Sequence, residues 1–170
     1  MVDEGANQGL AVTLPDPPRC GSVEATIDDK GRLRIPAQYV QYIHSLGDTK
    51  VFVTCVNRET ARVYPLSVWR RNEALFQTIR GDKESATMVA ALEKLASYTG
   101  AESVIDSNGR VPLTQNLRDM MGMQPKTSAH MTFFKNAFDL ETSAVVQRKL
   151  NSSLDVLVDG LAVLHANGIR

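Results

Sequence analysis

The stretch DDKGR (residues 28–32) returns 78 positions later as DSNGR (residues 106–110). Each copy begins with an Asp, ends with Gly and Arg, and follows a short β-like run that ends in Ile. A three-residue hairpin loop that ends in Gly favours a type I turn followed by a left-handed residue. We therefore predict two β-hairpins, in each of which the Asp and the Arg of the loop lie opposite each other.

The repeat extends to both sides of these loops. The same shift aligns Glu24 with Glu102, Ile27 with Ile105, Leu33 with Val111, and Ile35 with Leu113. A long-period repeat that occurs only twice indicates duplication of one module rather than a solenoid. Because a module of about 50 residues buries little surface by itself, we expect two modules that share one core.

The hydrophobic pattern predicts the same order of elements in both modules: a strand, the loop, a strand, a helix and two closing strands. These elements are expected at residues 23–27, 32–35, 37–46, 51–56 and 61–64, and again at 102–105, 111–113, 114–121, 131–134 and 137–140. Between the modules, amphipathic patterns predict two helices separated by Gly81. Pro112 removes a ladder hydrogen bond from its strand, which predicts an edge strand.

The C-terminal residues 142–167 are predicted to be helical, with a break near residues 151–153. The apolar positions of this helix are numerous, and only Asp155 and Asp159 interrupt its last part. So apolar a surface has to be buried against something. The tail therefore supports self-association.

The composition is that of an ordinary soluble globular chain, with 170 residues of which 43% are hydrophobic and 22% charged. No apolar run approaches the roughly 20 residues that cross a bilayer, and the first residues lack the basic region of a signal peptide. Cys20, Cys55 and three scattered His residues lack the spacing of a metal site or a Cys/His nucleophile. We expect an intracellular protein in which Cys55 is a small buried side chain.

The formal net charge is zero, but it is unevenly distributed. Residues 22–71 contain eight Lys and Arg against five Asp and Glu. Nucleic-acid binders draw much of their affinity from contacts with phosphates. The small excess of positive charge in this region is weak for a protein that binds nucleic acid as a monomer. If the chain binds DNA, it is expected to do so as an oligomer that multiplies a small footprint.

Residues 21–36 (GSVEATIDDKGRLRIP) resemble the opening of proteins of the MraZ family, as do the segments VYPLSVW (63–69), TGAE (99–102) and QNLR (115–118). The resemblance covers about residues 21–154. It implies an α+β fold in which two tandem AbrB-like swapped-hairpin modules form one pseudo-twofold β-barrel, flanked by helices. The implied divisions are a disordered arm (1–20), a first module (21–70), connecting helices (71–98), a second module (99–142) and a C-terminal helical region (143–170).

The resemblance also implies a function. Members of this family act as ring-shaped homo-oligomers that associate with the nucleoid in the cytoplasm, bind direct repeats of double-stranded DNA in their own promoter region, and regulate the division and cell-wall gene cluster. No enzyme activity, cofactor, metal or membrane contact is expected. The loop Arg is the residue tied to DNA binding in the family, and the residues expected to bind DNA here are Lys30, Gly31, Arg32, Arg34, Asn108 and Arg110. Asn108 stands where the first loop has Lys30, so the second module is expected to be the weaker DNA-binding half.

Three alternatives remain open from the sequence. Arg32 could merely pair with Asp28 and hold the hairpin together. Asp28 and Asp106 could be the carboxylate pair of a small barrel enzyme, although no nearby His, Ser motif or metal set completes such a site. The chain could also be an assembly scaffold without DNA binding, driven by its C-terminal helix. A gel shift with the chain's own upstream DNA separates a regulator from a scaffold.

Overall fold

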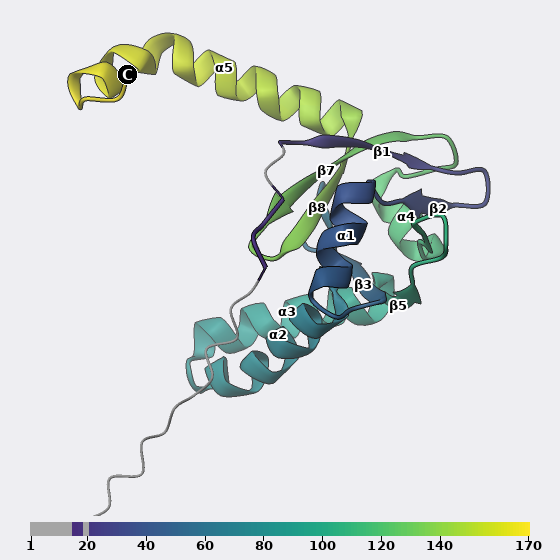
Figure 1. Ribbon diagram of the computed structural model, residues 1–170. Coiled ribbons are helices and arrows are strands. Elements are labelled where there is room, and N and C mark those ends of the chain that lie inside the picture. The colour runs from purple at the N-terminus through teal and green to yellow at the C-terminus, as the bar shows by residue number, and fades with distance from the viewer. Residues whose placement is uncertain (1–14, 19–20) are drawn as a thin grey trace, which may run out of the picture.

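The computed structural model describes residues 15–18 and 21–170, so most of the expected N-terminal arm lies outside the described residues. The strands are β1 (Val23–Ile27), β2 (Arg32–Arg34), β3 (Lys50–Cys55), β4 (Ala61–Pro65), β5 (Ala101–Val104), β6 (Arg110–Pro112), β7 (Ser128–Phe134) and β8 (Ala137–Thr142). The helices are α1 (Ala37–Ser45), α2 (Leu66–Thr78), the 3₁₀ turn η1 (Ile79–Gly81), α3 (Lys83–Thr99), α4 (Gln115–Met121) and α5 (Ser143–Ala166). Figure 1 shows these elements.

The eight strands form one antiparallel sheet in the order β5-β3-β4-β8-β7-β1-β2-β6. The two modules exchange strands, because β1 pairs with β7 while its repeat equivalent β5 pairs with β3. On the pseudo-twofold axis β2 pairs with β6, and Leu33 lies opposite its own repeat equivalent Val111. The predicted pseudo-twofold α+β barrel of two interleaved modules is therefore confirmed.

The barrel is nearly closed, and Pro112 explains the remaining gap. In the first module β1 and β2 form a ladder in which Thr26 is opposite Arg34. The repeat equivalent of Arg34 is Pro112, which has no N–H to donate. Accordingly β5 and β6 stand at the two ends of the strand order, joined by the second loop rather than by a ladder. The prediction that β6 is an edge strand is confirmed.

The core fills the inside of this barrel with one face of each strand. Ile27, Leu33, Val111 and Phe138 are each at most 1% exposed. Helix α1 closes one opening, where the ring of Tyr39 stacks on that of Phe138 with 4.5 Å between centroids. Cys55 is a free and fully buried cysteine in β3, as predicted. The alternation of apolar and polar residues thus fixes which side of each strand faces inward.

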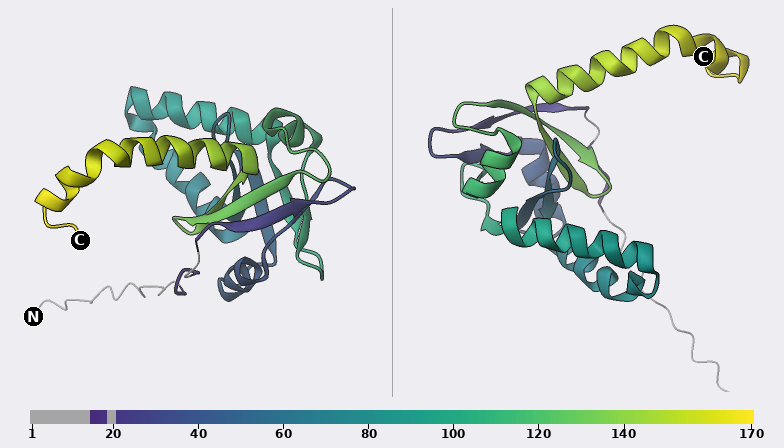
Figure 2. Two further views of the ribbon diagram at one scale, coloured as in Figure 1. Left: turned by 90° about the horizontal axis from the view of Figure 1, so that it is seen from above. Right: turned by 180° about the vertical axis from the view of Figure 1, so that it is seen from behind.

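Helices α2 and α3 form an antiparallel pair beside the barrel (Figures 1 and 2). The pair is anchored by Trp69, whose ring stacks on Phe52 of β3 at 4.2 Å. The carboxylate of Asp82 accepts a hydrogen bond from the backbone N–H of Ser85 and so caps the start of α3. Gly81 separates the two helices as predicted.

Helix α5 is continuous from Ser143 to Ala166, so the predicted break near residues 151–153 is wrong. Asn and Ser cost a helix only a few tenths of a kcal/mol each, and here their side chains bond within the helix. Ser153 donates to the carbonyl of Lys149 at 2.9 Å, and Gln147 donates to the side chain of Asn151 at 3.0 Å. The helix leaves the barrel on the side opposite the β1–β2 loop (Figures 1 and 2).

Among the described residues, no helix has the length and apolar character needed to span a bilayer.

Candidate nucleic-acid interface

The first loop is held by its own aspartate. The Asp28 carboxylate accepts hydrogen bonds from the backbone N–H groups of Lys30 (3.0 Å) and Arg32 (2.9 Å). The backbone N–H of Asp28 donates to the carbonyl of Arg32 at 2.9 Å, which makes the two residues a cross-strand pair. Gly31 closes the loop with a φ of 73°, the left-handed conformation that glycine adopts without strain. The predicted turn is confirmed.

The second loop repeats this arrangement. The Asp106 carboxylate accepts from the backbone N–H groups of Asn108 and Arg110, both at 2.8 Å. The backbone N–H of Asp106 donates to the carbonyl of Arg110 at 2.9 Å, and Gly109 has a φ of 71°. The two copies of the sequence motif therefore fold into two copies of one backbone conformation.

The backbone bonds also tune the two carboxylates. The backbone N–H of Arg32, with further bonds from the Arg32 side chain and Lys30, lowers the pKa of Asp28 below its ordinary value. The backbone N–H of Arg110 in the same way lowers the pKa of Asp106. Both carboxylates are thus held in the charged form, which suits hydrogen-bond acceptors and is the wrong direction for a general acid at neutral pH.

The loop arginines form a charge cluster that joins the two modules. In the first loop, Arg32 Nη2 lies 2.8 Å from Asp28 Oδ2, and in the second, Arg110 Nε lies 3.2 Å from Asp106 Oδ2. Each arginine also approaches the aspartate of the other loop, with 4.0 Å from Arg32 Nη1 to Asp106 Oδ2 and 4.0 Å from Arg110 Nη1 to Asp28 Oδ2. Both arginine side chains keep a little over a quarter of their surface exposed.

Backbone bonds bring the two loops together. The carbonyl of Gly31 in the first loop accepts from the backbone N–H of Leu113, just after β6, at 3.2 Å. The carbonyl of Gly109 in the second loop accepts from the backbone N–H of Ile35, just after β2, at 2.8 Å. Each loop is thus fastened to the strand end of the other module, so the two loops form a single site.

Arg118 of α4 is a site residue that the sequence reasoning did not single out. A Cβ built on Gly31 would lie 2.6 Å from the Arg118 guanidinium carbon, so the flexible end of the Arg118 side chain packs directly on this glycine and would have to shift for any larger residue. The Arg118 Nε is buried with no hydrogen-bond partner among the described residues, while its Nη2 donates to Gln115. The repeat places Val40 at the equivalent position, and a methyl group of Val40 lies 3.4 Å from a Cβ built on Gly109. The sequence did contain a signal for this residue: at the repeat position where the first module has apolar Val40, the second module has Arg118.

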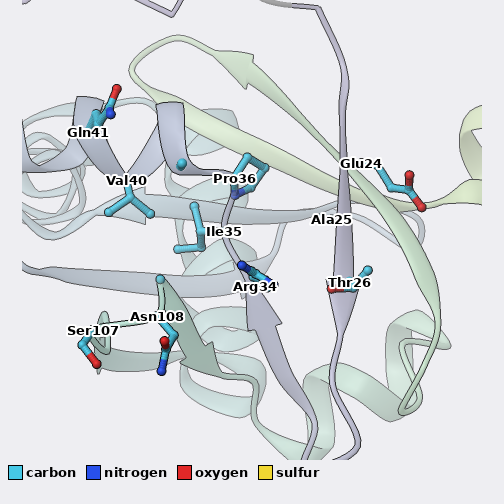
Figure 3. A pocket seen from close by; sticks show the side chains of 12 residues that line it. Glu24, Ala25, Thr26, Arg34, Ile35, Pro36, Val40, Gln41, Ser107 and Asn108 are labelled. Atoms are coloured by element: carbon cyan, nitrogen blue, oxygen red, sulfur yellow. The ribbon is translucent and has the colours of Figure 1, made fainter.

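Of the remaining predicted residues, two are cations without an ion pair. Lys30 and Arg34 are exposed and form no ion pair with any described residue, whereas Asn108 is an exposed neutral side chain. Arg34 and Asn108 line one open groove of about 760 Å³, between β1, the start of α1 and the second loop. Figure 3 shows Arg34 between Asn108 on one side and Thr26 on the other. The structure therefore brings Arg32 and Arg110 together through their aspartates and places Arg34 and Asn108 on one groove, while Lys30 is exposed on the first loop and Gly31 is buried.

No group of three or more His, Cys, Asp or Glu among residues 15–18 and 21–170 is arranged to hold a metal ion.

Comparison with known proteins shows which family this sequence resembles. Residues 20–91 match the model of a family described as "MraZ protein, putative antitoxin-like". A protein of Nitrosomonas europaea named transcriptional regulator MraZ is 27% identical over 104 residues, which are 61% of this chain and 68% of that protein. The protein of the same name from Koribacter versatilis is 32% identical over 100 residues, 58% of this chain and 66% of the relative.

A third match reaches further along the chain. The transcriptional regulator MraZ of Shewanella amazonensis is 27% identical over 138 residues, which cover 81% of this chain and 88% of the relative. These relatives bear the name of a regulator and not of an enzyme, so the small barrel enzyme considered from the sequence is set aside. The two interleaved modules with their paired loops, together with these matches, identify the chain as a member of the MraZ family.

Proposed function

We propose that this chain is a DNA-binding transcriptional regulator, and that the paired loops are its DNA-contacting surface. The observation that carries the proposal is the joining of the two loops into one site, from which the unpaired cations Lys30 and Arg34 project. Such cations bind phosphates without first breaking an ion pair. The names of the matched relatives, transcriptional regulator MraZ, support the same assignment.

The loop arginines have a different part in this proposal. The guanidiniums of Arg32 and Arg110 are fixed by their aspartates and keep part of their surface exposed. A fixed guanidinium loses little conformational freedom on binding, and its planar set of donors suits a guanine edge or a phosphate. We therefore assign base or phosphate contacts to Arg32 and, more weakly, to Arg110, because Asn108 gives the second loop no cation at its tip.

The finer elements of the proposal follow the family resemblance. The chain acts in the cytoplasm on the nucleoid, as a homo-oligomeric ring, at direct repeats upstream of its own gene and of the division and cell-wall genes. A cyclic assembly repeats one surface in one sense, unlike a twofold dimer. Direct repeats spaced by about 10 bp would present the same groove to successive subunits.

The test is binding of the full chain to duplex DNA from its own upstream region, measured by fluorescence anisotropy at two salt concentrations. Arg32→Ala is expected to abolish specific binding, and the affinity of the unmodified chain is expected to fall steeply with salt. Arg58→Ala is the matched control, because Arg58 is an exposed arginine in the turn before β4 and forms no ion pair with a described residue. Normal binding by Arg32→Ala, or an affinity independent of salt, would rule out the loop surface.

A scaffold without DNA binding is the second candidate, and the exposed apolar side chains of α5 favour it. The same measurement decides between the two. A chain that assembles but shows no preference for its upstream DNA over an unrelated duplex is a scaffold.

A further inference from the structure

The two loops share one backbone conformation but stand among different side chains. At several positions that the repeat makes equivalent, the residue beside the first loop is charged and the residue beside the second loop is not. The charged set is Asp29, Lys30, Arg34 and Arg118, and its uncharged counterparts are Ser107, Asn108, Pro112 and Val40. The first loop therefore stands beside three cations and one acid, whereas the second loop has no charge at these positions.

This difference gives the surface formed by the two loops a direction. Two identical loops on a twofold axis would meet the two strands of a duplex in the same way, as twofold dimers do on palindromic sites. Phosphate contacts position a protein on DNA but carry no sequence information, and cations make them. The first loop is equipped for such contacts. The uncharged groups of the second loop suit the edge of a base instead.

The side chain of Asn108 is placed for a base contact. Its backbone N–H donates to the carboxylate of Asp106 at 2.8 Å, and Gly109 closes the turn directly after it, so the loop holds this residue in position. The side chain is exposed, and its amide forms no hydrogen bond with any described residue. A free amide offers one acceptor and two donors. This set matches the N6 amino group and N7 of adenine in the major groove.

The groove of about 760 Å³ beside Asn108 fits a base better than a phosphate. Its charged lining residues are Arg34 and Glu24, one of each sign, so the groove as a whole does not attract an anion. Val40 adds an apolar side chain, the kind of group that contacts the methyl of the thymine paired with adenine. Figure 3 shows Ser107 and Asn108 together on one side of this groove.

We propose that Asn108 reads one adenine in each bound DNA repeat through a bidentate contact in the major groove, while the cations around the first loop hold phosphates. This inference rests on the proposed DNA-binding function and deepens it by naming the base and the residue that reads it. Lys30 holds the same position in the first loop, and its ammonium has donors but no acceptor for the N6 amino group. The chain thus binds DNA in one direction, which the position of this adenine sets.

The test uses the full chain and duplex DNA from its own upstream region, in which single adenines are replaced in turn by 7-deazaadenine. This base still pairs with thymine but lacks the N7 acceptor. Affinity measured by fluorescence anisotropy is expected to fall about threefold or more at one adenine in each repeat, as for the loss of one hydrogen bond. Asn108→Ala should lose at least that factor on unsubstituted DNA and should show no further loss with 7-deazaadenine at that position. The variant keeps the backbone N–H that Asp106 accepts, so its thermal transition should be unchanged.

Gln41→Ala is the matched control, because Gln41 is an exposed amide side chain that lines the same groove from α1 (Figure 3). This variant is expected to respond to 7-deazaadenine as the unmodified chain does. A response that persists in Asn108→Ala, or that is lost in Gln41→Ala instead, would overturn the proposal and leave the proposed function standing. Specific binding without any sensitive adenine would do the same. If the unmodified chain does not bind its upstream DNA specifically, the proposed function fails, and this inference fails with it.

Discussion

Arg32 in the first loop lies 4.0 Å from Asp106 in the second, measured from Nη1 to Oδ2, and the reciprocal pair of Arg110 and Asp28 has the same separation. Each loop therefore stands beside the opposite charges of the other, across the pseudo-twofold axis. The cluster of two arginines and two aspartates is neutral as a whole. The unpaired cations beside it are Lys30 and Arg34, and two exposed acids, Asp29 of the same loop and Glu24 of the same groove, stand near them.

This distribution of charge predicts that removing either unpaired cation affects DNA binding but not the stability of the fold. Lys30→Ala and Arg34→Ala should weaken DNA binding, and each should reduce the salt dependence of log K by about 0.9 for every phosphate that the variant no longer neutralises. Because these side chains are exposed and unpaired, the free energy of unfolding should change by no more than about 0.5 kcal/mol. Salt titrations of binding and urea denaturation measure the two effects. A variant that is destabilised yet keeps the original salt slope would assign a structural role to that residue.

Gly31→Ala should destabilise the protein more than Gly109→Ala. Both positions have a left-handed φ, which costs a non-glycine residue about 1–2 kcal/mol. At Gly31 the added Cβ would also force the flexible end of the Arg118 side chain to shift, which adds a small further cost, whereas at Gly109 the nearest atoms are 3.4 Å away. Urea denaturation of both variants measures the difference.

The Arg118→Ala background provides the control for that shift. With the guanidinium removed, Gly31→Ala should cost only as much as Gly109→Ala, since strain alone remains. If the extra cost of Gly31→Ala persists without Arg118, the contact between the two residues does not explain it.

Acid should destabilise the loops only below the ordinary range of carboxyl pKa values. The folded-state pKa values of Asp28 and Asp106 are lowered, so the stability they add is present above the unfolded-state pKa of about 4 and is lost as the pH falls through the lowered values. Asp28→Asn with Asp106→Asn keeps acceptors for the backbone N–H groups but removes the titration. The melting temperature of the variant should therefore fall less between about pH 5 and pH 3 than that of the unmodified chain. Parallel curves for the two proteins would contradict this account.

Asn108→Lys should strengthen DNA binding if the second loop contacts phosphates. The substitution gives the second loop the cation that Lys30 supplies to the first, at an exposed position where a longer side chain meets no obstacle on the solvent side. The salt slope should steepen by about 0.9 for each further phosphate that is neutralised. Gln77→Lys, at an exposed position of α2, adds the same charge away from the loops and should leave binding nearly unchanged. Equal increases in affinity from both variants would show a general charge effect rather than binding by the second loop.

The conformation of the two loops could be predicted from the sequence because their bonds are local. Asp28 reaches the backbone of Lys30 and Arg32 within the same five residues, and the glycine that closes each turn is written in the motif. The alternation of apolar residues likewise fixed the inward faces of the strands, and the repeat itself pointed to two equivalent modules with one core. The DNA-binding role of the loop residues was not determined in this way, and it stays a proposal.

The tertiary structure alone decided which charges meet. Arg32 and Asp106 are far apart along the chain, and they approach because Leu33 and Val111 bury their side chains together where β2 pairs with β6. The same pairing carries α4 over the first loop and sets Arg118 against Gly31. No local pattern encodes these contacts, since burial of apolar surface is non-directional and its partners are chosen by how the whole core packs.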